Sequence, residues 1–241
     1  MLKKINLENI LFLDIETVAQ HEHFSELSDS WKSLWEAKAR NLKKENEDDT
    51  AEAIYNRAAI YAEFGKIVCI SCGYFHTENG KQTFRIKSYY GDDEAKLLRE
   101  FCDLLNKHFN KPVHSLCAHN GKEFDFPYVS RRCIINGVSI PEILDVQGKK
   151  PWEINNLDTM ELWKFGDFKN FTSLNLLAAA LGIPTPKDDI DGSQVYHVYY
   201  KEKNLPRIVT YCQKDVITIA QVVLKYRFEN LLKADDVVYL C

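Results

Sequence analysis

A short apolar strand that ends in two acids is the feature that most constrains the fold of this chain. The apolar run Ile10–Leu13 is followed by Asp14 and, two residues later, by Glu16. Residues two apart in a strand point to the same face, so both carboxylates are expected side by side at the end of a sheet strand. Such neighbours repel unless a cation lies between them. Most Asp-x-Glu pairs are solvated strand ends, so a metal site needs support from elsewhere in the chain.

Beyond this strand, the sequence alternates between strand-like and helical patterns. Strands are expected at about Asn9–Ile15, Lys66–Phe75, Gln82–Tyr90 and Val113–Ala118, with a hairpin turn at Thr77–Gly80. Helices are expected after a cap at Asp92 or Asp93 and at about Phe124–Asn136, Ser173–Leu181 and Leu205–Leu232. A hairpin combined with strands joined through helices predicts an α/β fold with a mixed sheet.

Residues 20–63 differ from the rest of the chain in composition and in hydrophobic pattern. They are rich in Ala, Glu and Lys, contain the solvated run Lys43–Asp49, and place Leu27, Trp31, Leu34 and Trp35 at helical spacing. We expect a helical insertion that follows the first strand and covers a sheet edge, although it could also shape substrate entry. With no clear linker, residues 1–241 are predicted to form a single domain.

Composition limits the environment and the partners of the protein. No stretch reaches the ~18 apolar residues of a membrane helix, which predicts a cytoplasmic protein without a membrane partner. The seven cysteines are an odd number scattered through apolar sequence, so they are expected to be reduced and mostly buried. The net charge of −4 lacks the global basic field of proteins held to nucleic acid by charge alone. Any polyanion is therefore expected to be bound locally or through cations.

Two further acids lie at the ends of predicted elements or on apolar faces. Asp125 opens a predicted helix with Pro127 just inside it, so its ordinary interpretation is a helix cap. Tyr211 and Asp215 are four residues apart and share one helical face. The sequence around Asp215 is nearly apolar, and a buried acid is costly unless it is paired or bound to a metal.

Three motifs, in this order, resemble those of the DEDD superfamily of 3′–5′ exonucleases: Phe12–Thr17, Asn120–Tyr128 and Tyr211–Asp215. A Tyr four residues before the last Asp, with Thr210 rather than His before it, is similar to the DEDDy branch. The segments Leu157–Asn170 and Ser173–Ile183 look like the stand-alone PolB-like exonucleases, which are related to the proofreading domain of family-B DNA polymerases. The resemblance covers about residues 8–228.

This resemblance implies a ribonuclease H-like fold, with a mixed five-stranded sheet and helices on both sides. It implies a 3′–5′ exonuclease that uses two divalent cations, Mg²⁺ or Mn²⁺, and releases 5′-mononucleotides from the 3′ end of single-stranded nucleic acid, with DNA favoured over RNA. The alternatives are a catalytically silent nucleic-acid-binding module of this fold and an exoribonuclease specific for RNA or oligonucleotides. A polymerase or repair partner would be needed for proofreading, and the sequence does not identify one.

The resemblance also assigns roles to the acids and the tyrosine. Asp14 would bridge both cations, Glu16 and Asp215 would complete the site on the nucleophile side, and Asp125 would hold the second cation largely through water. Tyr211 would orient the attacking water, since a phenol with a pKa of ~10 is protonated at neutral pH.

Substrate contacts are implied at four further positions. Thr17 and Val18 match the place where the family seats the terminal nucleotide, and Asn120 and Phe124 match contacts to the single strand. Phe124 could equally be a core residue. Candidate phosphate contacts, each individually expected to be a solvated charge, are Arg131, Arg132, Lys149, Lys150, Lys164 and Lys169. The remaining acids in family-like segments are interpreted as caps or turns: Asp158, Asp188, Asp189 and Asp191.

Overall fold

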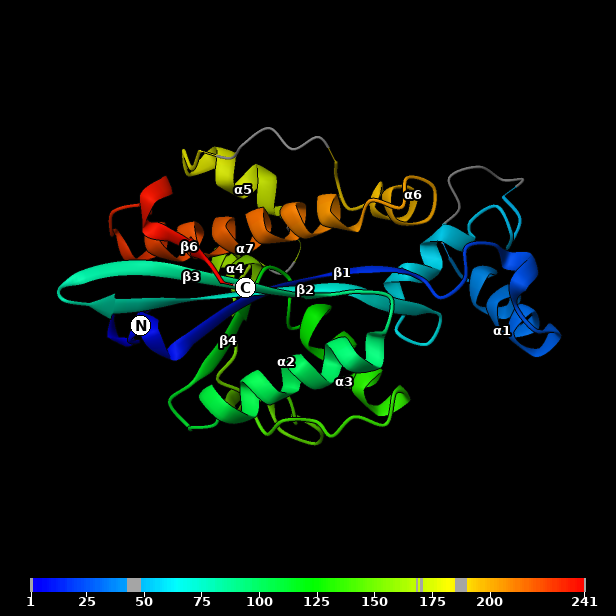
Figure 1. The fold of residues 1–241 in the computed structure, drawn as a ribbon, viewed down its shortest axis with the longest axis horizontal. Coiled ribbons are helices and arrows are strands. Elements are labelled where there is room, and N and C mark those ends of the chain that lie inside the picture. Colours follow the sequence, from blue (N-terminus) through cyan, green and yellow to red (C-terminus); the bar gives the residue numbers. More distant parts are fainter. Residues whose placement is uncertain (1, 43–48, 168, 170, 185–189, 241) are drawn as a thin grey trace.

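A mixed sheet of six strands runs through the molecule, and helices cover both of its faces (Figure 1). The computed structural model describes residues 2–42, 49–167, 169, 171–184 and 190–240. The strand order is β5-β4-β1-β2-β3-β6; β1 and β3 run antiparallel to β2, and the other neighbours are parallel. The strands are β1 Ile10–Ala19, β2 Gly65–Glu78, β3 Lys81–Tyr90, β4 Ser115–Ala118, β5 Leu157–Asp158 and β6 Val237–Tyr239.

The helices form one layer on each side of the sheet (Figure 1). One face carries α2 Glu94–His108 and α3 Asp125–Ile135, and the other carries the long helix α7 Leu205–Arg227. The remaining α-helices are α1 Asp29–Ala39, α4 Thr159–Lys164, α5 Leu174–Ala180 and α6 Val195–Tyr200. Short 3₁₀ helices lie at Leu2–Lys4, Leu7–Asn9, Phe24–Glu26, Tyr55–Ile60, Pro151–Glu153 and Ala234–Asp236.

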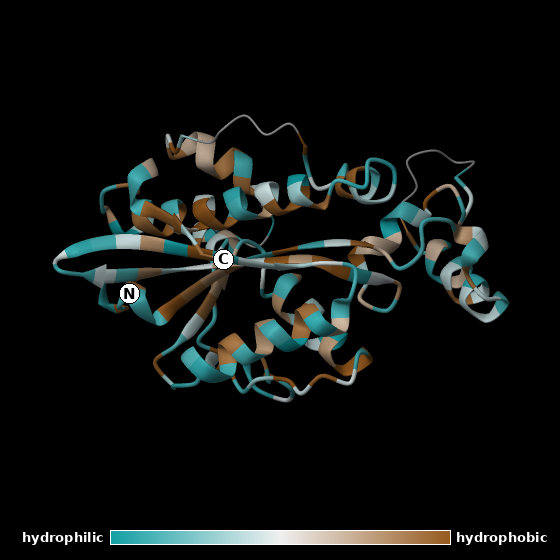
Figure 2. Cartoon of the chain, viewed as in Figure 1, coloured by the Kyte–Doolittle hydropathy of each residue, from teal (hydrophilic) through white to brown (hydrophobic). Residues whose placement is uncertain are grey.

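The alternation of side chains along β1 divides the core into two layers. Leu11, Leu13 and Ile15 point toward α2 and α3, whereas Ile10 and Phe12 pack against the α7 side. The central strands are accordingly apolar along much of their length in Figure 2. Because both faces of β1 are covered, it can present chemistry to a ligand only where polar side chains interrupt the apolar strand, at Asp14 and Glu16.

The predicted α/β fold with helices on both sides is confirmed, but the predicted count of five strands is wrong. The sixth strand is β6, in which Val237 pairs with Phe84 on the outer edge of β3. β1 also continues to Ala19, beyond the predicted end at Ile15, because β2 keeps pairing with it past the acids. The last helix ends at Arg227 rather than near Leu232, where Phe228 adopts a left-handed conformation (φ 59°).

Between β1 and β2 the chain forms α1 and two 3₁₀ helices at one end of the sheet (Figure 1). Trp35 is fully buried in this segment, and its Nε1 donates to the Ala51 carbonyl at 2.7 Å. The Tyr200 hydroxyl on α6 donates to the Ala19 carbonyl at 2.6 Å, which anchors the start of the segment. Most of the predicted solvated run, residues 43–48, lies outside the described residues.

The cysteines follow the prediction that they are buried thiols. All six that the structure describes are free and buried. Cys69 and Cys72 lie in core clusters on opposite faces of the sheet, as their spacing in a strand predicts. In the part of the chain that is described, no helix is long and apolar enough to cross a membrane.

Candidate active site

Asp14 and Glu16 lie on the face of β1 that packs against α7. They follow Phe12 at intervals of two residues, so they share its face, and they pair across the sheet with Ser71 and Cys69 of β2. Glu16 is only 7% exposed. Directly after Glu16 the pairing register shifts, as expected for a β-bulge. The predicted side-by-side placement of the two acids therefore holds, at a buried and irregular point of the strand.

Asp125 is brought to the same strand by the loop that follows β4. The β4 strand pairs with β1 only up to Phe12, and beyond that point the Ile15 N–H donates to Asp125 Oδ1 at 3.2 Å. Asp125 is the first residue of α3 and is 3% exposed. The interpretation of Asp125 as a helix cap is wrong, because Phe124 is the N-cap residue and the Asp125 carboxylate accepts from β1, at the edge that β4 leaves unpaired.

α7 supplies the third part of the site. Asp215, Tyr211 and Cys212 lie on the part of this helix that faces β1, and the Cys212 thiol donates to the Asp14 carbonyl at 3.3 Å. The possible ligand atoms of Asp14, Glu16 and Cys212 all lie within 4.8 Å of one another. The structure thus brings together residues that are about 200 positions apart in the sequence.

Burial and mutual repulsion disfavour the charged forms of these acids. Burial raises the pKa of Asp14 well above its ordinary value, and the carboxylates of Glu16, Asp125 and Asp215 raise it further. The pKa of Glu16 is raised for the same reasons, first by burial and next by Asp215. Burial raises the pKa of Asp125 to about 7, although hydrogen bonds from backbone N–H groups oppose the shift.

This donor set fits a divalent cation. Apart from Cys69 beside Glu16, the charges that raise the pKa values of Asp14 and Glu16 are those of the other carboxylates in the cluster. Carboxylate oxygens are the ligands that Mg²⁺ and Mn²⁺ prefer, and the Cys212 thiol adds a softer donor beside them. A cation bound among these groups would remove the repulsion that the shifts record.

Tyr211 remains a protonated hydrogen-bond donor in this environment. Burial raises the pKa of its phenol, and Asp215, Glu16 and Asp14 raise it further. The hydroxyl also hydrogen-bonds to the Asp215 carboxylate, which favours the neutral phenol. The arrangement suits orientation of a water molecule and not removal of a proton by phenolate.

The four predicted substrate positions flank the acids along the chain. The Thr17 hydroxyl donates to the Ala59 carbonyl at 2.9 Å, and the Val18 side chain is fully buried, so only its backbone could meet a ligand. Phe124 is partly buried, with its ring centre 5.3 Å from that of Tyr128. Asn120 Oδ1 is enclosed and has no hydrogen-bond partner among the described residues.

Two contributors to the site were not assigned from the sequence. Cys212 is three residues before Asp215 on the same helix, and residues at this spacing share a helical face, which is the signal that would have identified it. Asp158 is the expected cap, accepting from Met160 N–H at the start of α4. It also accepts from the N–H groups of Asn120 (3.0 Å) and Lys122 (3.1 Å), so it holds the loop before Asp125 in place.

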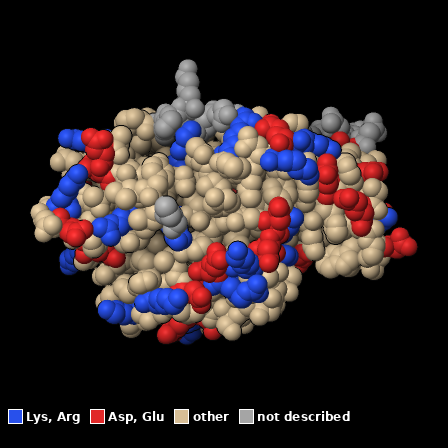
Figure 3. All heavy atoms as spheres, in the orientation of Figure 1, with Lys and Arg blue, Asp and Glu red and all other residues tan. Residues whose placement is uncertain are grey.

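The predictions for the other charged residues, as solvated charges, phosphate contacts, caps or turns, are only partly confirmed. Arg132 is buried, at 3% exposed, and paired with Glu94, so its prediction as a solvated charge or phosphate contact is wrong. Asp191 accepts from Ser193 N–H at 2.8 Å in a turn, as expected. Asp188 and Asp189 lie outside the described residues. On the face seen in Figure 3, basic and acidic side chains are interspersed, in line with the small net charge.

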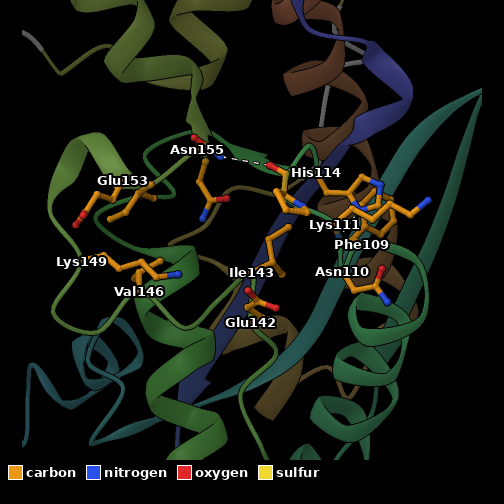
Figure 4. Close-up of a pocket in the computed structure, with 13 residues that line it drawn as sticks. Phe109, Asn110, Lys111, His114, Glu142, Ile143, Val146, Lys149, Glu153 and Asn155 are labelled. Atoms are coloured by element: carbon orange, nitrogen blue, oxygen red, sulfur yellow. Dashed lines mark hydrogen bonds between the residues drawn. The ribbon is translucent and has the colours of Figure 1, made fainter.

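A hollow of about 110 Å³ lies elsewhere in the molecule, between the end of α2 and the loop before β5 (Figure 4). Its walls include Lys111, His114 and Lys149. His114 precedes β4, whereas Asp125 follows that strand, so the hollow and the acids lie at opposite ends of β4. It contains none of the predicted site residues, and the acid cluster is the better candidate for catalysis.

Comparison with known proteins gives an independent result. The model of a family described as "Predicted 3′-5′ exonuclease related to the exonuclease domain of PolB" matches residues 60–236, more than half of the chain. The matched region includes Asp125, Tyr211 and Asp215, while Asp14 and Glu16 precede it. A search of curated proteins gave no match.

Proposed function

The chain belongs to the family of predicted 3′–5′ exonucleases related to the exonuclease domain of PolB, and from this premise we propose a specific activity for it. It hydrolyses phosphodiester bonds stepwise from the 3′ end of single-stranded nucleic acid and releases 5′-mononucleotides. DNA is the favoured substrate over RNA. Residues 1–241 act as one exonuclease domain in which residues 20–63 are an insertion.

The observation that carries this proposal is the cluster of four acids. Asp125 lies at the open edge of β1 and Asp215 on α7, and the carboxylates of both raise the pKa values of Asp14 and Glu16 on β1. A protein gains nothing in stability from burying such groups together without a cation. Their joint retention at one place supports a role in binding metal for catalysis.

Two divalent cations, Mg²⁺ or Mn²⁺, are the proposed cofactors. Asp14 would contact both, Glu16 and Asp215 would hold the cation on the side of the nucleophile, and Asp125 would hold the other. When bound, such cations make water nucleophilic near neutral pH and stabilise the charge that develops on the phosphate and the leaving oxygen. With cations present, an acidic site can accept a polyanionic substrate.

The remaining residues act on water and substrate. Tyr211, kept protonated by its surroundings, is hydrogen-bonded through its hydroxyl to the attacking water and orients it. The backbone at Thr17 and Val18 seats the terminal nucleotide. The Asn120 amide and the Phe124 ring contact the single strand, and the unpaired Asn120 Oδ1 supports this role because a buried acceptor favours a donor from a ligand.

A degradation assay with end-labelled strands tests the proposal. Single-stranded DNA and RNA of one sequence, labelled at the 3′ or the 5′ end, are incubated with Mg²⁺, Mn²⁺ or EDTA. We expect stepwise loss from the 3′ end of DNA that requires metal, is abolished in Asp14→Ala and persists in Glu123→Gln, which changes an exposed acid two residues before Asp125.

Two other results would reject parts of the proposal. Cleavage of RNA alone would identify an exoribonuclease. Binding of both strands without any cleavage, unaffected by Asp14→Ala, would identify a nucleic-acid-binding module.

A further inference from the structure

Two phenylalanine rings stand out on the surface near the second motif. Phe165 is 89% exposed and Phe171 is 68% exposed, although burial of such rings is strongly favourable. Lys164 Nζ lies 4.4 Å from the centre of the Phe171 ring, over its face. We name Lys164, Phe165 and Phe171 the aromatic platform. Lys164 is adjacent to Phe165 in the chain and contacts the Phe171 ring, so the three residues are neighbours. Exposed apolar side chains that lie near one another are typical of binding sites.

The backbone holds Phe165 in a conformation that residues with large side chains rarely adopt. It has a left-handed φ of 44° at the end of α4, and Gly166 follows with φ 92°. This conformation costs free energy for any residue except glycine, and a bulky residue is an outlier there. The ring of Phe165 is left exposed and contributes little to the core, so it is free to contact a ligand.

The platform is fixed beside the loop that leads to Asp125. His119 Nδ1 is hydrogen-bonded to Thr159 Oγ1 at 2.9 Å, at the start of α4. His119 Nε2 is hydrogen-bonded to the Thr172 carbonyl at 2.8 Å, next to Phe171. The segment that carries the platform is therefore tied at both ends to the residue before Asn120.

α4 also sets the distance of the platform from the acids. Its six residues carry the chain about 9 Å away from Asp158, at about 1.5 Å per residue. Phe165 follows the last of these residues. Trp163 of α4 stacks on Tyr226, which lies eleven residues, about 16 Å, along α7 from Asp215, so α4 packs against α7 at a distance from the acids.

The chemistry of the platform matches a single nucleic-acid strand. Every base has a face that can stack on an aromatic ring, and the ammonium groups of Lys164 and Lys169 suit the phosphates between bases. Asp167 is the acid of this segment, and its carboxylate accepts the Lys169 N–H at 3.0 Å. Stacking, which tolerates any base, is therefore expected to contribute more than charge.

We infer that the aromatic platform binds bases of the single strand upstream of the nucleotide being cleaved. This inference rests on the proposed function, since the strand is placed with its 3′ end at the acid cluster. It assigns a role in substrate binding to Phe165 and Phe171, and neither ring takes part in the hydrolysis.

A binding experiment tests the inference without catalysis. A fluorescein-labelled 20-nucleotide oligothymidylate is titrated in EDTA with wild type and with the double variant Phe165→Ala/Phe171→Ala, and anisotropy gives Kd. We expect Kd to rise at least tenfold, as the loss of base stacking predicts. The control is Trp152→Ala, which removes a ring that is 76% exposed, 5.2 Å from Lys150 Nζ, and located on the 3₁₀ helix before β5. Its Kd should stay within twofold of wild type.

Cleavage of substrates of two lengths distinguishes an effect on strand binding from an effect on the hydrolysis step. With Mg²⁺, the double variant should cleave a 3-nucleotide strand at the wild-type rate and show a raised KM for the 20-nucleotide strand. Unchanged Kd and KM in the double variant would overturn the inference, and so would equal loss on both lengths. If wild type cleaves neither strand, the proposed function fails, while the binding titration still decides whether the rings hold the strand.

Discussion

The pKa values of Asp14, Glu16 and Asp125 are all raised by burial and by neighbouring carboxylates. At neutral pH these residues oppose folding in the absence of a cation, because their charged forms are disfavoured in the folded state. A site that binds metal commonly has this property, since function and stability favour different side chains at the same position. Single substitutions should therefore separate the two effects.

Replacing Asp14 with Asn is expected to raise stability and remove activity. Asn has nearly the same shape and carries no charge, so the repulsion from Glu16 and Asp125 disappears. In EDTA the free energy of unfolding should increase by on the order of 1 kcal/mol, as measured by urea denaturation. Exonuclease activity with Mg²⁺ should fall by roughly 10²–10³-fold or more. Glu123→Gln should leave both within error, and a destabilised Asp14→Asn would contradict the repulsion.

Asp125 should make stability depend on pH in the absence of metal. Its pKa is about 7 in the folded protein and near the ordinary 3.8 when unfolded, so the folded state holds the proton more tightly between these values. The free energy of unfolding in EDTA should therefore decrease as pH rises from about 4 to 7. Asp125→Asn should show a flatter profile in urea denaturations at pH 5, 6, 7 and 8. Equally steep profiles for both proteins would argue against this titration.

At the scale of elements, a buried ion pair joins α2, α3 and β2. The Glu94 carboxylate accepts from Arg132 Nε at 2.8 Å, from the Ile67 N–H at 2.7 Å and from Asn136 Nδ2 at 2.9 Å. Arg132 Nη1 donates to the Ala62 carbonyl at 2.8 Å. Since α3 begins at Asp125, this network fixes the helix that carries one of the acids.

Glu94→Gln should destabilise the protein strongly. The change leaves the buried Arg132 charge without a partner, and breaking such a pair costs about 3–5 kcal/mol. The exposed pair of Lys201 and Glu22, at 2.8 Å, is the control, and Lys201→Ala should have a much smaller effect because exposed ion pairs contribute little. Urea denaturation measures both. The double variant Glu94→Leu/Arg132→Met should recover much of the loss, and similar costs for Glu94→Gln and Lys201→Ala would refute the assignment.

The elements with a clear period or turn signal were predictable from the sequence. The hairpin between β2 and β3 turns at Asn79 and Gly80, both with positive φ, as an Asn-Gly pair favours. In contrast, β5 has two residues and β6 has three, so their pairing depends on edges supplied by distant strands and leaves no periodic pattern.

The acids of the candidate site were predictable because each lies in a local pattern of its own. Asp14 and Glu16 follow the period of a strand, and Asp215 follows that of a helix. The hydrogen bond from Ile15 to Asp125 joins residues 110 positions apart, and no local pattern encodes it. The same holds for the contact of Cys212 with the Asp14 carbonyl, which depends on how α7 packs against β1.

For the molecule as a whole, acidic and basic residues are nearly balanced in number. The chain has 31 Lys and Arg against 35 Asp and Glu, and both signs are interspersed on the face in Figure 3. Any nucleic acid would then be held by few phosphate contacts, together with stacking and bound cations.

The salt dependence of Kd for a single strand measures how many phosphate contacts the protein makes. In EDTA, Kd for the 20-nucleotide strand should change with NaCl along a log–log slope of only about 1–2, as two or three phosphate contacts predict. Anisotropy titrations from 50 to 300 mM NaCl give the slope. A slope of about 5 or more would indicate a broad basic surface and would contradict the charge distribution described above.

The short pairing of β4 with β1 has a consequence for how the acids keep their geometry. Since Asp125 is hydrogen-bonded to β1 itself, three of the four acids share one strand as their frame of reference. Asp215 lies on α7, which packs against that strand through the core around Phe12 and through the contact of the Cys212 thiol with the Asp14 carbonyl. A small shift of α7 would therefore move Asp215 relative to the other three acids, which keep their places on β1.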